Sequence, residues 1–195
     1  MAQTLVCVSP NKSQTEVCAT SKPMSDTWQR DDYEISSDPA RLNLDLIHQY
    51  LSTQTYWASG RSREVVQRSI ENSFPFGLYK GNEQVGFARV VTDYATFAWI
   101  ADVFILPEHR GQGLSKWMME VVIEHPRLQG FRRWVLATKD AHGLYEKFGF
   151  IKLHRPERWM ERPDPNMKES PDYWRTDGTH ASGVLTEEVT NSGQE

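Results

Sequence analysis

The segment HRGQGLS, residues 109–115, places Gly111 and Gly113 directly before a strong helical pattern. Glycine costs about 1 kcal/mol in a helix interior, so its use at a helix start needs a reason. The first amides of a helix have no internal partner, and the helix dipole adds positive charge there. A loop without side chains lets a phosphate approach those amides. Residues 110–115 therefore predict an anion-binding loop, and a simple glycine turn between a strand and a helix is the alternative.

The segment DAHGLYEKFG, residues 140–149, is a second candidate for chemistry. His142 lies one helical turn before Tyr145, so the two side chains share a face of the predicted helix. An imidazole titrates near neutral pH, which suits a general base or a water relay. The alternative for His142 is a surface or capping role, and for Tyr145 it is packing between helix and sheet. Asp140 is interpreted as a helix cap.

The elements that must position these residues follow from hydrophobic periodicity and turn signals. Helices are expected at 43–57, 62–73, 114–124 and 140–149. Strands are expected at 33–37, at two places within 74–93 around a Gly81–Asn82 turn, and at 95–107, 131–138 and 150–153, with 158–162 as a further candidate. Strands dominate the middle and helices are interleaved later, which predicts an α/β or α+β fold with a mixed sheet covered by helices.

These segments together resemble the GNAT superfamily of acyl-CoA-dependent N-acetyltransferases. The first signature of that family is Gln or Arg, two residues, Gly, one residue, and then Gly or Ala. Those positions are held by Arg110, Gly113 and Ser115. The second signature is a helical Tyr ahead of a Gly-Phe strand start, here Tyr145 before Gly149 and Phe150. The resemblance covers about 33–162 and implies a mostly antiparallel central sheet, splayed at the strand that binds acetyl-CoA.

The resemblance also implies where the cosubstrate, acetyl-CoA, would bind. Backbone amides would hold its pyrophosphate along the loop formed by Arg110, Gly111, Gln112, Gly113, Leu114 and Ser115. Its pantetheine arm would pair with Val103, Phe104 and Ile105 as a false neighbouring strand. One strand N–H would polarise the thioester carbonyl. Tyr145 would lie near the sulfur and protonate the leaving thiolate.

The first predicted helix ends in two aromatic residues, Tyr56 and Trp57, shortly before Gly60. In the family this region closes over the acceptor, and an aromatic ring there could hold a cation or an apolar group. Packing in the core is the alternative for both residues.

Three positions depart from the family pattern. Ser115 replaces the usual Gly or Ala, and Thr138 stands where the family often has Asn. Trp99 falls where some members carry a Glu that acts as general base, so that base is missing. The nearest acids in sequence are Asp93 and Asp102, and the sequence assigns a role to neither.

Net charge, cysteine content and composition limit the location, the partners and the domain boundaries of this protein. The 195 residues have a formal net charge of -4 and two cysteines, Cys7 and Cys18, which fits a reducing compartment. A near-neutral body predicts no nucleic-acid partner, and no apolar run reaches the roughly 18 residues of a membrane span. We expect a cytoplasmic or nuclear protein, monomeric or homodimeric, without a metal. Composition predicts a disordered extension at 1–29, one domain at 30–163, and a disordered acidic tail at 164–195.

The sequence thus predicts an acetyl-CoA-dependent N-acetyltransferase that acts by direct transfer in a ternary complex. The acceptor is expected to be a primary amine on a small molecule or a peptide. A non-catalytic acyl-CoA sensor and a protein-interaction module on the same fold are the alternatives.

Overall fold

The computed structural model describes residues 26–162, which are built on a six-stranded sheet with the order β1-β2-β3-β4-β5-β6. Neighbouring strands are antiparallel except β5 and β6, which are parallel. The strands are β1 Thr27–Arg30, β2 Tyr33–Ser36, β3 Phe74–Lys80, β4 Glu83–Thr92, β5 Phe97–Ile105 and β6 Arg133–Val135. The helices are α1 Leu44–Gln54, α2 Arg63–Glu71, α3 Leu114–Glu124 and α4 His142–Tyr145. The predicted mixed, mostly antiparallel sheet flanked by helices is confirmed.

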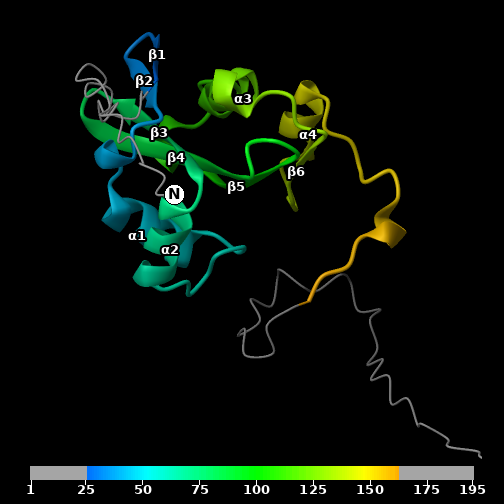
Figure 1. Ribbon diagram of the computed structural model, residues 1–195. Helices are drawn as coiled ribbons and strands as arrows, with labels where there is room; N and C mark the ends of the chain where they lie inside the picture. The colour runs from blue at the N-terminus through cyan, green and yellow to red at the C-terminus, as the bar shows by residue number, and fades with distance from the viewer. Residues whose placement is uncertain (1–25, 163–195) are drawn as a thin grey trace, which may run out of the picture.

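The helices cover the two faces of this sheet separately, with α1 and α2 on one side and α3 and α4 on the other (Figure 1). The core under α1 and α2 includes Ile47, Leu51, Val66, Phe87 and Phe104. The core under α3 and α4 includes Val90, Ile100, Met118, Val122 and Tyr145. Successive residues of a strand point to opposite faces, so β4 and β5 are covered on both sides. This double burial explains why β5 is apolar almost throughout.

The sheet opens between β5 and β6. Only Phe97, Ala98 and Trp99 of β5 pair with β6. From Ile100 to Ile105 the strand keeps β4 on one edge, and no strand of the described chain pairs with its other edge. Backbone N–H and C=O groups need partners, so this edge can accept an extended ligand. The splay expected at β5 is therefore present.

Regular structure is already present before the predicted boundary at residue 30. Residues 27–30 form β1, which pairs with β2 through a turn at Asp31, where φ is 52°. Trp28 explains this order, because its ring packs 6.3 Å from the ring of Phe76 and 5.5 Å from that of His125. The polar residues around Trp28 are the reason why the sequence predicted disorder here. The rest of the predicted extension, 1–25, and the predicted tail, 164–195, lie outside the described residues.

Helix α1 is shorter than the predicted 43–57. It ends at Gln54, and the extended Thr55 donates its hydroxyl to the Leu51 carbonyl at 2.7 Å. Tyr56 and Trp57 therefore belong to the loop between α1 and α2, rather than to the helix.

The prediction of strands at 150–153 and 158–162 was wrong. The described residues form no strand after β6. Ile151 and Leu153 are 80% and 43% exposed, and Pro156–Arg158 is a 3-10 turn. This C-terminal segment leads away from the sheet (Figure 1), so its strand-like pattern meets no neighbouring edge. A hollow of about 760 Å³ between it and β6 includes none of the residues of the glycine loop. Strand β6 is also shorter than the predicted 131–138.

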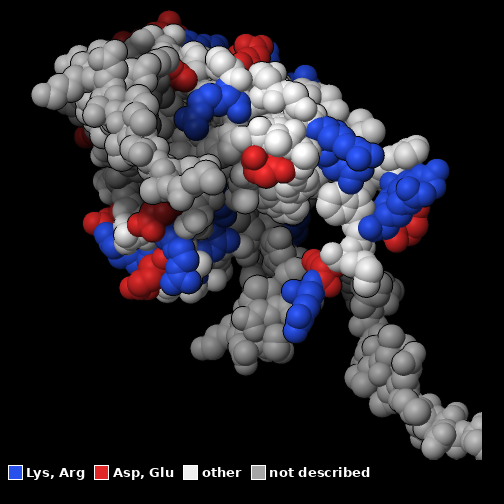
Figure 2. Space-filling model, in the orientation of Figure 1, with Lys and Arg blue, Asp and Glu red and all other residues white. Residues whose placement is uncertain are grey.

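No helix between residues 26 and 162 is long and apolar enough to cross a membrane. On the face drawn in Figure 2, Lys and Arg side chains are interspersed with Asp and Glu over the described surface, and they do not gather into one continuous basic stripe.

His125 is an almost fully buried polar residue at the end of α3. Its ring packs against Phe74 and Phe76, and its Nδ1 accepts a hydrogen bond from the Arg127 N–H at 3.1 Å. Burial lowers the pKa of His125, although the carboxylate of Asp26 opposes this effect. Folding therefore favours the neutral imidazole.

We expect this burial to make stability depend on pH. Below the ordinary His pKa of about 6.5 the unfolded chain binds a proton that the folded chain does not, so stability falls as pH falls, by up to about 1.4 kcal/mol per pH unit. His125→Asn keeps an acceptor for the Arg127 N–H but does not titrate, so its urea-unfolding profile should be flatter between about pH 5 and 6.5. The exposed His154→Asn is the control and should keep the wild-type slope. Equal slopes in all three proteins would contradict the assignment.

Candidate active site

The glycine loop requires glycine because of its backbone. Gly111 and Gly113 adopt φ values of 78° and 74°, in the left-handed region that disfavours residues with a Cβ. A Cβ at Gly111 would meet nothing within 4 Å, so packing does not demand glycine there. The loop is open to solvent, as a binding loop must be.

The same loop presents unused donors. Gly113 is the N-cap residue of α3, and no side chain caps that helix. Within the described residues, the amides from Gly111 to Lys116 donate to no backbone or side-chain acceptor. A run of free amides at a helix N-terminus favours a bound anion such as a phosphate. The structure therefore fits the predicted phosphate contacts of Gly111, Gln112, Gly113, Leu114 and Ser115.

Arg110 differs from this prediction. Its amide donates to the Pro107 carbonyl at 3.2 Å, and its Nε donates to the Ile105 carbonyl at 3.0 Å. Its Nη2 contacts the Tyr50 hydroxyl of α1. Arg110 therefore fastens the end of β5 to α1, and the run of free amides begins one residue later. The loop is also tied to β2, where the Tyr33 hydroxyl lies 3.0 Å from His109 Nδ1 and 3.3 Å from Gln112 Oε1.

The open edge of β5 leads directly into this loop. Phe104 stacks on Tyr50 with ring centroids 4.2 Å apart, and Phe104 and Ile105 are both buried. Val103 is partly buried against the α3 side of the core. These side chains fix the strand in the sheet, so the main chain of Val103, Phe104 and Ile105 is held rigidly at the edge that lacks a strand partner.

Tyr145 of α4 is 8% exposed. Its hydroxyl has no hydrogen-bond partner among the described residues, yet it is not one of the fully buried polar atoms without a partner. The hydroxyl therefore reaches solvent-accessible space. Burial first, then the nearby Tyr56 and Asp140, raise the pKa of Tyr145 to about 12. The phenol is thus protonated at neutral pH and can act as a proton donor.

The other predicted site residues near Tyr145, namely Tyr56, Trp57 and His142, lie in three different environments. The Tyr56 hydroxyl accepts a 2.9 Å hydrogen bond from the Lys139 N–H, which joins the α1–α2 loop to the segment before α4. Trp57 packs mainly in the core under α1 and α2, and its buried Nε1 has no partner within 26–162. His142 is exposed at the start of α4, and its side chain makes no hydrogen bond within the described chain. Tyr56 therefore lies against the segment that leads into α4, whereas Trp57 contributes chiefly to packing.

Asp93 does not replace the missing Glu. Its carboxylate accepts hydrogen bonds from the amides of residues 95–97 and from the Thr96 hydroxyl. These bonds, led by those from Thr96, hold the pKa of Asp93 well below its usual range. Asp93 therefore shapes the turn between β4 and β5.

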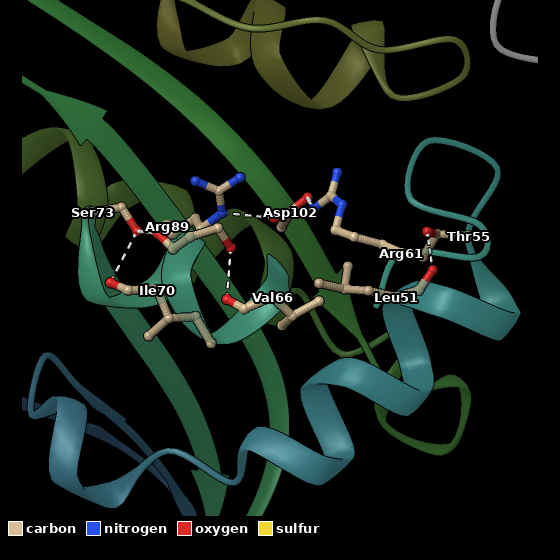
Figure 3. Close-up of polar contacts among 9 residues, drawn as sticks. Leu51, Thr55, Arg61, Val66, Ile70, Ser73, Arg89 and Asp102 are labelled. Carbon is tan, nitrogen blue, oxygen red and sulfur yellow. Dashed lines mark hydrogen bonds and ion pairs between the residues drawn. The ribbon is translucent and has the colours of Figure 1, made fainter. Parts of the chain in front are cut away.

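Asp102 lies in β5 at a register shift against β4, with φ at 53°. Its side chain is only 3% exposed and pairs with two arginines (Figure 3). Arg61 Nη1 lies 3.2 Å from Oδ1 and 2.9 Å from Oδ2, and Arg89 Nε lies 2.6 Å from Oδ2. Arg61 comes from the α1–α2 loop and Arg89 from β4, so Asp102 joins that loop to the sheet.

Sequence reasoning missed this arginine pair. Arg61 is far from Asp102 along the chain, and only a fold can bring them together. A signal did exist, because Arg89 and Asp102 interrupt two apolar strands, and charged residues in such strands are rarely left unpaired. Within residues 26–162, no group of three or more His, Cys, Asp or Glu side chains is placed to hold a metal ion.

The fold and site define an acyltransferase architecture, and comparisons with known proteins agree. The model of the acetyltransferase (GNAT) family matches residues 44–150. A Gibberella zeae protein provisionally described as an acetyltransferase, FG08082, is 34% identical over 74% of this chain and 93% of its own. A Xanthomonas campestris crystal structure assigned to the GNAT family is 50% identical, with a TM-score of 0.67, over 69% of this chain and 95% of that one. The chain belongs to the GNAT family of acetyltransferases and is an acyltransferase.

We expect the Asp102 ion pairs to stabilise the fold strongly. Asp102→Asn removes the charge but tolerates the left-handed backbone, so it isolates the electrostatic effect. Removing one member of a buried ion pair leaves uncompensated charge, and the free energy of unfolding should fall by about 3 kcal/mol, measured with urea. The control is Asp45→Asn at the exposed Asp45–Arg63 pair, which should cost less than about 1 kcal/mol. Similar losses in both variants would contradict this prediction.

Proposed function

We propose that this protein transfers an acetyl group from acetyl-CoA to a primary amine, by direct attack in a ternary complex. The observation that carries the proposal is the continuity of two features. The edge of β5 is open from Ile100 to Ile105, and it leads into the free amides of the glycine loop. An extended thiol arm can pair with the strand while its diphosphate meets the helix N-terminus.

The chemistry follows from this placement. The amine nitrogen forms a bond to the acetyl carbon as the C–S bond breaks. A free N–H of β5 stabilises the oxyanion, and Tyr145 protonates the leaving thiolate. The two cysteines, Cys7 and Cys18, lie outside the described residues, and the proposed direct attack needs no acyl-enzyme. Holding both substrates together supplies most of the rate.

The proton lost by the amine needs a separate route. Asp93 is committed to a turn and Asp102 to two arginines. His142 is the remaining candidate from the sequence, and its exposed side chain on α4 can exchange protons with water.

Among the relatives, a Caenorhabditis elegans protein named thialysine N-epsilon-acetyltransferase is 24% identical over 65% of this chain and 86% of its own. The name of that relative gives an ε-nitrogen as the acceptor, which agrees with the amine proposed here.

Gly113→Glu tests the cosubstrate site. The variant places a side chain and a negative charge at the N-terminus of α3, where the diphosphate would bind, so acetyl-CoA affinity measured by calorimetry should fall by at least about 100-fold. Gly130→Glu is a matched control, because Gly130 also has a left-handed φ, 79°, with open space around its Cβ position. Both variants carry the same backbone strain and charge. Wild-type affinity in a folded Gly113→Glu protein would overturn this site.

Tyr145→Phe tests the proton donor. The ring and its packing are kept, so kcat should fall by about 10²–10⁴ while acetyl-CoA affinity changes little. Because the pKa of Tyr145 is raised to about 12, ionisation of this phenol should cause no loss of wild-type activity up to about pH 10. Tyr79→Phe is the control, since the Tyr79 hydroxyl likewise has no hydrogen-bond partner among residues 26–162 but is fully buried and lies on β3. Wild-type kcat in Tyr145→Phe, measured by CoA release, would remove Tyr145 from the mechanism.

A further inference from the structure

The cluster formed by Arg61, Asp102 and Arg89 carries more positive charge than it needs. Both guanidinium groups are protonated at any physiological pH, whereas Asp102 supplies one negative charge. Neither arginine has another ion-pair partner within 26–162. The cluster therefore has a net charge of about +1 in a partly buried place, where an unpaired charge is costly.

A purely structural role explains only half of the cluster. Arg61 contacts both oxygens of Asp102, which neutralises the carboxylate and fastens the α1–α2 loop to β5. Arg89 is not part of that loop, and its side chain is only 12% exposed. The second guanidinium thus adds a desolvated charge that the attachment of the loop does not require.

Both arginines keep unused donors. Arg89 uses Nε and Arg61 uses Nη1, and their other side-chain nitrogens have no partner in the described chain. None of these nitrogens is fully buried. Figure 3 shows the guanidinium groups on either side of Asp102, with terminal nitrogens directed to the same side, away from α1. A planar fork of this kind matches a carboxylate or a phosphate.

The cluster also lies where the acceptor would enter. Asp102 directly precedes Val103 within the open edge, so it lies farther from the glycine loop than Val103, Phe104 and Ile105 do. With the diphosphate at that loop, the thioester lies toward Asp102. Arg61 belongs to the same loop as Tyr56, whose hydroxyl accepts a hydrogen bond from the Lys139 N–H just ahead of α4, the helix that carries Tyr145. The extra positive charge is therefore next to the proposed site of transfer.

We propose that the acceptor is a primary amine that also carries an anionic group, a carboxylate or a phosphate, bound by Arg89 with help from Arg61. This inference rests on the proposed function and names the substrate class of the same site. The charge of the cluster disfavours acceptors that carry only positive groups, such as polyamines.

The test compares matched amines with the full-length protein and saturating acetyl-CoA, following CoA release. The pairs are β-alanine with 3-aminopropan-1-ol, O-phosphoethanolamine with ethanolamine, and L-lysine with 1,5-diaminopentane. The anionic member of at least one pair should have a kcat/KM at least about 10-fold higher, as a charge-assisted hydrogen bond predicts. The first two pairs distinguish a carboxylate from a phosphate.

Variants then locate the preference. Arg89→Gln should reduce it to less than about 3-fold by lowering kcat/KM for the anionic amine alone, and Arg89→Lys should restore part of it because the charge returns without the fork. The control is Arg68→Gln on the exposed face of α2, which should keep the full preference. Calorimetry with CoA present and the N-acetylated products as ligands should show the same loss of binding in Arg89→Gln.

The possible outcomes separate the two proposals. Equal kcat/KM for anionic and neutral amines, or a preference that survives Arg89→Gln, overturns the anionic acceptor and leaves acetyl transfer intact. No CoA release with any amine, in a protein that binds acetyl-CoA, overturns both. A preference lost only in the Arg89 variants, in rates and in product binding, supports the inference.

Discussion

The separation of β5 from β6 after Trp99 is the constraint on which the rest of the site depends. Parallel pairing holds the two strands together for three residues, and beyond that point no strand from residues 26–162 lies beside one edge of β5. Such an edge is tolerated only if water or a ligand satisfies its backbone groups. Apolar packing of Phe104 and Ile105 keeps the strand in the sheet despite this missing neighbour. The opening is thus a rigid feature of the core.

Beside this opening, the α1–α2 loop is attached both to β5 and to the segment that precedes α4. One attachment is the ion pair from Arg61 to Asp102, and the other is the hydrogen bond from the Lys139 N–H to the Tyr56 hydroxyl. Asp102 itself lies at a register shift with a left-handed φ, a conformation that Asp adopts more readily than most residues. A strained residue in a central strand persists only when its surroundings hold it there, and the contact of Arg61 with both oxygens of Asp102 does so here.

Features encoded locally could be predicted from the sequence. The glycine loop, the long apolar β5 and the helix after Gly113 were evident because each rests on neighbouring residues and a regular period. The ion pairs of Asp102 could not be predicted, since they join residues whose proximity only the complete fold creates. Residues 150–153 show the opposite error, because an alternating pattern predicts a strand only where an edge is available to pair with it. Trp28 shows that a single, partly buried aromatic residue can order a segment of otherwise polar composition.

The N-terminus of α3 has a consequence beyond recognition. This helix follows its N-cap residue Gly113, and no side chain from the described residues caps it, so its first amide donors have no partner there. A ligand that meets those donors acts as the missing cap, and it stabilises the folded chain by mass action. At a concentration 100 times its dissociation constant, such a ligand adds about 2.7 kcal/mol to the free energy of unfolding. The lifetime of the folded protein would then follow the supply of its own cosubstrate.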